Sequence, residues 1–382
     1  MLGHKATSIV NYRPAPKIYP WRGRIAAECT CLENKRARKG SVGSNPTPSA
    51  NNYLVNDLQL LRHVHNPILR KNPANPWEAG SVFNPTVWEH KPGRYGMLYR
   101  ATNDIVSSEA GRYMSSIGLA WSSDAINWER QLEPFITPDQ AYENRLGCED
   151  PRITKIGDTY YIFYTAVGGT KTGQNVRIAL ASTRDFKTVT KYGVIGPDIS
   201  SKAATLFPEP INGRYTILWA DQSGPTSAKA GQSRIICTSF DSIDQLICPP
   251  SGFWTPEKIE QGHVKIPPAG QFAQQEVGAR PIKTPDGWLV IYSGFSNQPN
   301  WTICAALLDT DNPQHILAAS TEPLLTPETD YETSGVVNHV CFPEGTLVIG
   351  DQLYVYYGSG DQGICLATAR LTDILNLLTP AA

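Results

Sequence analysis

Short runs of aromatic and β-branched residues recur along the chain at intervals of about sixty residues. The clearest run in each repeat follows a turn and is about seven residues long; the five runs are Arg94–Arg100, Thr159–Thr165, Arg214–Ala220, Gly287–Ser293 and Gln352–Gly358. Tyr, Trp, Ile, Val and Phe dominate these runs, as half-buried strands require. Gly, Asp and Asn mark the turns between them. The pattern predicts strands, and no helical period of comparable length competes.

Two further units accompany each aromatic run. One follows it and ends at Asp124, Asp185, Asp241, Asp309 or Leu371. The other precedes it and is centred on Pro85, Pro151, Pro208, Pro281 or Pro343. A weaker segment between repeats supplies a fourth strand. Four antiparallel strands, repeated five times, predict an all-β fold, namely a five-bladed β-propeller.

The first strand of each propeller blade lines the central channel, so the residue before each repeated proline should occupy an equivalent place. These residues are Asn84, Asp150, Phe207, Arg280 and Phe342. Because proline favours an extended backbone at the residue before it, we expect Asp150 to point into the axial pocket. Strand alternation further predicts that only one of Glu149 and Asp150 faces this pocket.

An acid on the axis suggests general acid catalysis, although Asp150 could instead be a structural partner of Arg152. Glycosidases use two carboxylates, which in inverting enzymes lie ~6.5–9.5 Å apart. Candidates for the second carboxylate come from other blades and are Glu209, Glu276, Glu344 and Asp361. Fold alone does not give function, so a propeller that binds carbohydrate without catalysis is an alternative.

The net charge of −1 conceals an imbalance. Residues 1–50 hold nine Lys or Arg against two acids, so their balance is +7 and that of the remaining chain is −8. We therefore predict that residues 1–50 are a disordered N-terminal extension and that residues 51–382 form a single five-bladed β-propeller catalytic domain.

The tetrapeptide Gly43–Pro46 is what the DNA sequence GGTTCGAATCC, found in the T-arm of tRNA genes, would encode. We therefore hypothesise that the open reading frame was extended too far upstream, through a neighbouring tRNA gene, and that the native protein starts near Asn51 or later. The rival hypothesis is a genuine basic arm. N-terminal sequencing of the native protein separates the two, because a start at Met1 would contradict the first.

Several classes of function lack their motifs. No run of about 18 apolar residues and no signal peptide is present, so we expect a cytoplasmic protein without a membrane partner. The eight cysteines form no CxxC pair, and the histidines form no HExxH motif. P-loop, GxSxG and helix-opening GxGxxG motifs are absent as well. We expect no metal, no organic cofactor and no nucleic-acid partner.

Several longer segments resemble glycoside hydrolase family 130, which contains β-mannoside phosphorylases and β-1,2-mannosidases on a five-bladed propeller. These segments are VFNPTV, LYRATND, GCEDPRI, LFPEPINGRY, PIKTPDGWLVIYSG and the stretch from Tyr331 to Leu371. The resemblance runs from roughly Asn66 to the C-terminus. It implies that Asp150 is the general acid and donates its proton through a sugar hydroxyl. It also implies that Asn84, Arg100 and Asp361 bind the sugar, and that Lys202 matches a phosphate-holding lysine.

The chain departs from the family's phosphorylases at three places. Ser293 replaces a phosphate-contacting histidine, Trp219-Ala220 replaces a His-Arg pair, and Glu276 lies where a Gly-rich KIGAGPPP stretch is usual. A phosphate site needs several cations, and a new carboxylate would repel phosphate and could activate water. Arg280 could restore some positive charge.

We therefore predict an inverting glycosidase that acts on a β-mannoside oligosaccharide, with Asp150 as acid and Glu276 as base. Arg152 and Arg280 are assigned to the substrate site together with Asn84, Arg100, Lys202 and Asp361. The alternative is a phosphorylase that uses inorganic phosphate to release mannose 1-phosphate. Family members often assemble as dimers or hexamers, so a homo-oligomer is a further expectation.

Overall fold

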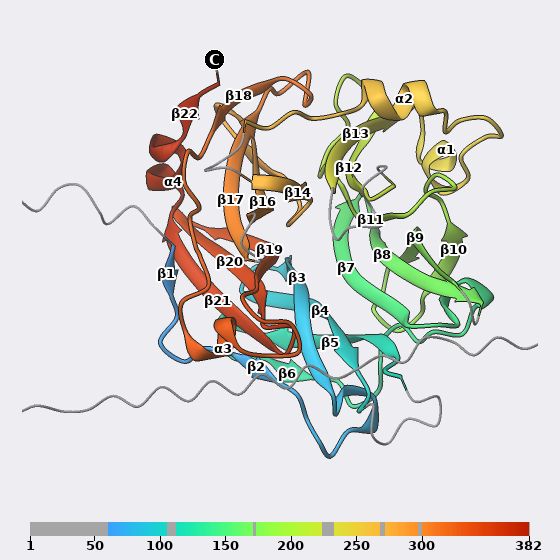
Figure 1. Cartoon of the computed structure of the whole chain (residues 1–382), viewed down its shortest axis with the longest axis vertical. Helices are drawn as coiled ribbons and strands as arrows, with labels where there is room; N and C mark the ends of the chain where they lie inside the picture. Colours follow the sequence, from blue (N-terminus) through green and yellow to red (C-terminus); the bar gives the residue numbers. More distant parts are fainter. Residues whose placement is uncertain are drawn as a thin grey trace, which may run out of the picture. The chain divides into compact units, whose positions relative to one another are not determined.

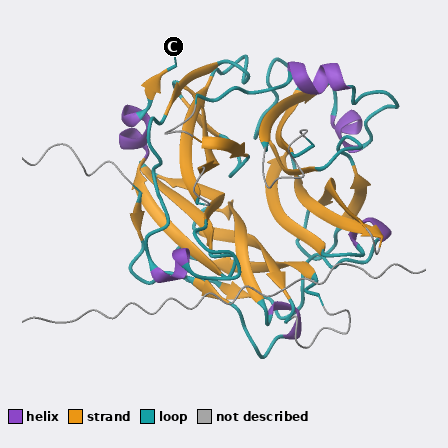
Figure 2. Cartoon of the chain, viewed as in Figure 1, coloured by secondary structure: helices purple, strands orange, loops and turns teal. Residues whose placement is uncertain are grey.

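The computed structural model describes residues 60–104, 112–170, 173–223, 233–267, 272–296 and 300–381. These residues all belong to one compact unit, Leu54–Ala382. Strands dominate the unit and its helices are short (Figure 2). In this part of the chain no helix combines the length and the apolar character needed to cross a bilayer. The predicted extension, residues 1–50, lies outside the described residues.

The largest sheet has the order β10-β9-β8-β7-β5-β4-β3, with β6 paired to β5 (Figure 1). It contains two antiparallel groups, which are joined by a short parallel pairing of Ser115 with Gly147. The first group consists of β3 (Ser81–Lys91), β4 (Arg94–Thr102), β5 (Ser115–Ser122) and β6 (Glu129–Arg130). The second consists of β7 (Gly147–Ile156), β8 (Thr159–Thr170), β9 (Gly173–Thr183) and β10 (Thr190–Val194).

Three separate sheets follow as the third, fourth and fifth groups. The third consists of β11 (Ser201–Leu206), β12 (Tyr215–Asp221) and β13 (Arg234–Phe240). The fourth consists of β14 (Phe272–Glu276), β15 (Ile282–Thr284), β16 (Gly287–Ser296), β17 (Trp301–Leu308), β18 (Ile316–Ala319) and β22 (Thr379–Pro380). The fifth consists of β19 (Cys341–Ile349), β20 (Gln352–Ser359), β21 (Gly363–Arg370), β1 (Leu61–Arg62) and β2 (Leu69–Arg70).

Short helices connect the strands. They are the 3-10 helices η1 (Pro76–Glu78) and η2 (Ala141–Glu143), and the α-helices α1 (Ile243–Ile247), α2 (Pro256–Gln261), α3 (Asp330–Thr333) and α4 (Leu371–Leu377).

The five aromatic runs are the middle strands β4, β8, β12, β16 and β20, which confirms the predicted repeat. The predicted equivalence of the residues before proline is wrong in two groups. Strand β11 ends at Leu206, so Phe207 lies beyond it, and Arg280 lies between β14 and β15. In the third group Ala203, with φ 56°, shares the backbone conformation of Asp150.

Hydrophobic packing links each group to the next. Five buried clusters lie between groups one and two, two and three, three and four, four and five, and five and one. Large side chains such as Trp219 and Trp288 are fully buried there. Full burial of a large apolar side chain stabilises a fold by ~1.5–3 kcal/mol, so these clusters hold the groups together.

Three groups contain the same buried polar triad: a glutamate from a short helix, a tyrosine from the middle strand and a base from the outer strand. The three glutamates, Glu78, Glu143 and Glu332, have no exposed surface. The triads are Glu78–Tyr99–Arg130, Glu143–Tyr164–Lys191 and Glu332–Tyr357–Arg62. Each therefore ties a helix to both the middle and the outer strand of its group.

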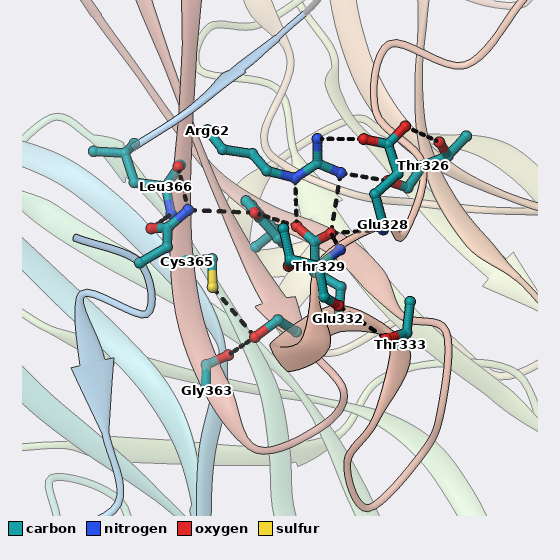
Figure 3. A network of polar contacts seen from close by, with 12 residues as sticks. Arg62, Thr326, Glu328, Thr329, Glu332, Thr333, Gly363, Cys365 and Leu366 are labelled. Carbon is teal, nitrogen blue, oxygen red and sulfur yellow. Dashed lines mark hydrogen bonds and ion pairs between the residues drawn. The ribbon is translucent and has the colours of Figure 1, made fainter. Parts of the chain in front are cut away.

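The third triad joins residues from opposite ends of the described chain (Figure 3). Arg62 Nε donates to Glu332 Oε1 at 2.8 Å, and the Tyr357 hydroxyl donates to the same oxygen at 2.8 Å. Arg62 also donates to the Thr326 carbonyl. The side chain of Asn66 pairs with the backbone of Leu366 through two hydrogen bonds of 2.8 Å. These contacts hold the N-terminal strand β1 against β21.

We expect Arg62→Met to lower the free energy of unfolding by about 3 kcal/mol, because it leaves the buried Glu332 carboxylate without its cation. Urea denaturation measures this loss. The control is Arg370→Met, whose partner Asp351 is exposed, and its cost should stay below about 1 kcal/mol. Equal effects of the two substitutions would show that the triad adds nothing beyond a surface ion pair.

Candidate active site

A β-bulge in β3 and another in β7 place polar side chains in the space between the inner strands. Strand register shifts between Phe83 and Pro85 in β3 and between Glu149 and Arg152 in β7. At the bulges Asn84 and Asp150 have φ values of 50° and 53°. This left-handed backbone costs ~1–3 kcal/mol and is tolerated best by Asn and Asp. The expected extended backbone is therefore wrong, because a bulge rather than proline geometry orients Asp150.

The Arg100 guanidinium, from β4, holds both acids of the Glu-Asp pair. Nη2 donates to Glu149 Oε1 at 2.6 Å, and Nη1 donates to Asp150 Oδ1 at 3.2 Å. Asn84 Nδ2 donates to the same Asp150 oxygen at 2.9 Å. The expectation that only one of the two acids faces the site is wrong, because the bulge breaks the alternation of β7.

The two acids respond differently to this shared environment. Burial raises the pKa of Glu149 to about 7, although Arg100 opposes the rise. Burial also acts on Asp150, but there Arg100, helped by Lys202 and Arg152, holds the pKa below its ordinary value. Of the two acids, burial therefore favours the protonated form of Glu149, whereas Arg100 favours the ionised form of Asp150.

A second charged pair comes from the third and fourth groups. Lys202 Nζ, from β11, lies 2.9 Å from Glu276 Oε1, from the end of β14. Burial disfavours the charged lysine, yet the Glu276 carboxylate holds the pKa of Lys202 above its ordinary value. Glu276 is fully buried, and its Oε2 has no hydrogen-bond partner among the described residues.

Asp361, in the turn after β20, completes the cluster. Its charge interacts with those of Arg100, Asp150, Lys202 and Glu276, and burial raises its pKa to about 6. Its φ of 52° is again left-handed. The structure therefore brings together six of the residues that the sequence analysis assigned to a site: Asn84, Arg100, Asp150, Lys202, Glu276 and Asp361.

Asn84 retains one free acceptor in this site. Its Oδ1 is buried and has no partner among the described residues. A Cβ at Gly358 would lie 2.2 Å from that oxygen, so only glycine at position 358 leaves room for the Asn84 amide. The site thus offers an unpaired amide oxygen and an unpaired carboxylate oxygen to hydroxyl donors.

Arg152 supports the site without lining it. Its guanidinium donates to the carbonyls of Val277 and Gly278 and pairs with Glu344 Oε1 at 3.0 Å. It also donates to the Asp150 carbonyl at 3.2 Å. Only 1 % of Arg152 is exposed, so the predicted substrate contact is wrong. Glu344 likewise serves this buried pair.

Two other candidates lie elsewhere. Arg280 lines a separate cavity whose lining contains none of the site's acids. Glu209 pairs with Lys283, another residue of that cavity, at 3.2 Å. The assignment of Arg280 to the substrate site is therefore corrected, because Arg280 does not lie on a bulged inner strand.

The sequence did not point to several residues that contact Arg100. Ser115 Oγ accepts from Arg100 Nε at 3.1 Å, and the ring of Phe83 lies 4.6 Å from the Arg100 guanidinium. The ring of Tyr113 lies 5.8 Å from the same guanidinium. These residues carry no motif, but a basic residue in a buried strand signals that partners must surround it.

The positions that depart from the family's phosphorylases flank the Lys202–Glu276 pair. Ala220 is the cross-strand neighbour of Lys202, and Ser293 is the cross-strand neighbour of Glu276. Ser293 donates to the Thr302 carbonyl at 3.1 Å, and Trp219 is buried in a hydrophobic cluster. No cation accompanies Lys202 from these two positions.

Within the described ranges, no group of three or more His, Cys, Asp or Glu side chains could hold a metal ion. The arrangement therefore combines acids held by a buried arginine and a lysine with unpaired oxygens that can accept from hydroxyl groups.

Comparisons with known proteins agree with this description. Residues 62–380 match the family model of glycoside hydrolase family 130, described as beta-1,4-mannooligosaccharide phosphorylase. The chain belongs to glycoside hydrolase family 130, and it is an enzyme that acts on mannosides.

Three relatives illustrate the similarity. A 1,2-beta-oligomannan phosphorylase of Thermoanaerobacter sp. (strain X514) is 33% identical over 83% of this chain and 99% of the relative. The β-1,2-mannobiose phosphorylase structure from Listeria innocua, in complex with β-1,2-mannobiose, has 25% identity and a TM-score of 0.68, covering 84% of this chain and 99% of that one.

The third relative is a solved structure from the same family. Its description says that the GH130 family of mannoside phosphorylases contains glycoside hydrolases that target beta-1,2 mannosidic linkages in Candida mannan. It has 25% identity and a TM-score of 0.68, and it covers 85% of this chain and 95% of that one.

We expect the proton on Glu149 to make stability depend on pH. A carboxyl whose pKa rises on folding, here from 4.5 to about 7, stabilises the protein at low pH and loses that contribution as pH rises through the folded value. Glu149→Gln removes the titration, so wild-type stability should fall relative to the variant between pH 5 and pH 8. Urea midpoints measure this difference.

Asp361 titrates in the same window in both proteins, so the comparison isolates Glu149. Parallel curves across that pH range would contradict the assignment of the proton to Glu149.

Proposed function

We propose that the five strand groups are the blades of a five-bladed β-propeller formed by residues 51–382. Two observations support this architecture. Hydrophobic clusters join each group to the next and the fifth to the first. In addition, the N-terminal strand β1 pairs with β21 in the last group, as expected when the two ends of a chain close one ring. The candidate active site then lies on the axis between the inner strands.

We propose that the enzyme hydrolyses β-mannosidic linkages in oligosaccharides with inversion of configuration. The Lys202–Glu276 ion pair of 2.9 Å carries this proposal. Phosphate needs several fixed donors or cations. Here the lysine that would serve phosphate is already neutralised by a carboxylate, and its cross-strand neighbour is Ala220.

In this mechanism Asp150 is the general acid and Glu276 is the general base. The unpaired, buried Oε2 of Glu276 requires a donor, and the attacking water would supply it. Removal of a proton from that water at Oε2 produces the nucleophile. Lys202 pairs with Oε1 and leaves Oε2 free to accept the proton.

Asp150 must be protonated when the substrate is bound. Glu149 and Asp150 share the Arg100 guanidinium, and burial favours a proton on Glu149. A bound sugar displaces water from Asp150, which favours its neutral form and therefore a shift of that proton from Glu149 to Asp150. The proton then leaves through a sugar hydroxyl toward the departing oxygen. Asn84 Oδ1 and Asp361 accept hydrogen bonds from sugar hydroxyls.

Phosphorolysis is the second candidate. The Thermoanaerobacter and Listeria relatives are phosphorylases by name, and Lys202 lies beside the acids in this chain. In that reaction phosphate replaces water as nucleophile and mannose 1-phosphate is released. It requires phosphate to bind despite the Glu276 carboxylate.

Incubation with β-1,2-mannobiose in the presence and absence of inorganic phosphate separates the two reactions. We expect mannose to form at the same rate in both, without mannose 1-phosphate. Strict dependence on phosphate would overturn hydrolysis. Asp150→Asn is the catalytic control and should reduce kcat by roughly 10²–10⁴-fold while leaving sugar binding intact.

In the same assay Glu276→Gln should also lose hydrolysis by roughly 10²–10⁴-fold, because no base remains to activate water. The substitution frees Lys202 from its ion pair, so added phosphate should now produce mannose 1-phosphate. Full hydrolytic activity in Glu276→Gln would remove Glu276 from the mechanism and leave Asp150 as the only assigned catalytic residue.

A further inference from the structure

A second cavity, of about 270 Å³, lies beyond the candidate active site along the inner strands. All five groups contribute to its lining, through Trp88 and Glu89, Ile153 and Lys155, Pro208, Arg280–Lys283, and Thr346–Val348. It is thus a space on the same axis as the active site.

Strand geometry separates this cavity from the catalytic acids. On β7 the lining residues Ile153 and Lys155 follow Asp150 by three and five positions, which corresponds to roughly 10 and 16 Å along a strand. On β3, Trp88 and Glu89 follow Asn84 by four and five positions. Between the two spaces on β7 lies the buried side chain of Arg152.

Arg280 is the unusual residue of this cavity. It is half-buried, and it forms no hydrogen bond or ion pair with any residue that the structure describes. Burial lowers the pKa of its guanidinium, and no charged neighbour compensates. A guanidinium partly removed from water without a partner destabilises a protein, and at a ligand site the ligand supplies the missing acceptor.

The other charges around the cavity favour an anion. Three of its four charged lining residues are basic, namely Lys155, Arg280 and Lys283. Lys283 pairs with the exposed Glu209, and Lys155 lies over the ring of Tyr160. Glu89 is the one acid in the lining and accepts from the backbone of Gly93. The cavity therefore carries positive charge that the protein itself does not balance.

We propose that this cavity is a second binding site, separate from the active site, which takes a phosphate group through Arg280. The planar guanidinium matches phosphate oxygens with two parallel hydrogen bonds, and Lys155 lies at the rim as a further cation. The volume exceeds that of a free phosphate ion. The apolar walls formed by Trp88, Ile153 and Leu347 leave space for the remainder of a small phosphate ester.

Calorimetric titration with inorganic phosphate tests the site in a Lys202→Met background, which removes the lysine of the active site. We expect binding to persist in Lys202→Met and to weaken at least about tenfold when Arg280→Gln is added, because a charge-assisted pair is lost. Arg280→Gln alone should hydrolyse β-1,2-mannobiose at the wild-type rate. Arg280→Lys keeps the positive charge but loses the planar guanidinium, so it should weaken phosphate binding less than Arg280→Gln does.

Titration with mannose 6-phosphate distinguishes the two sources of the phosphate group. Tighter binding than inorganic phosphate assigns the cavity to a sugar ester, and weaker binding assigns it to the free ion. Loss of all phosphate binding in Lys202→Met alone would overturn the proposal. Unchanged phosphate affinity in both Arg280 variants would overturn it as well. If Arg280→Gln fails to fold, Arg280→Lys alone provides this test.

Discussion

The buried Arg152 guanidinium joins three strand groups at the point where their inner strands approach one another. It extends from the second group to two carbonyls of the fourth and to Glu344 of the fifth. A buried charge is costly unless its donors find acceptors, and here the acceptors are the carbonyls of Asp150, Val277 and Gly278 and the carboxylate of Glu344. The left-handed turn at Asp150 and the segment that follows Glu276 are therefore held by the same side chain.

The two cations of the active site are also paired with acids. Arg100 serves two acids and Lys202 serves a third, so neither cation remains free for an anionic co-substrate. Neutral sugar hydroxyls and water are better suited to such a site than phosphate, because they need acceptors rather than cations. The unpaired oxygens of Asn84 and Glu276 provide those acceptors. The proposed hydrolysis thus gives Glu276 two roles, in the choice of nucleophile and in its activation.

Periodicity predicted much of the fold, because each middle strand is a run of aromatic and β-branched residues with its own turn. The repeat also singled out Asn84 and Asp150 and offered Asp361 as a further acid, and the family resemblance added Arg100 and Lys202. The errors have two physical causes. Bulges and left-handed residues break strand alternation, so Glu149 could not be placed beside Asp150 from spacing alone. A repeated proline also does not mark equivalent backbone positions in every group, so Arg280 lies between two strands and lines another cavity.

The triad around Glu332 has a consequence for biogenesis. In the first two groups all three members lie within about sixty residues, so each triad can form soon after its group is synthesised. In the last group Arg62 and Glu332 are 270 residues apart. Strand β1 leaves the ribosome early yet remains without its partner until β21 has been made. The nascent chain therefore carries the unpaired strand β1 until β21 is made. During this interval the chain is most exposed to aggregation and to chaperones.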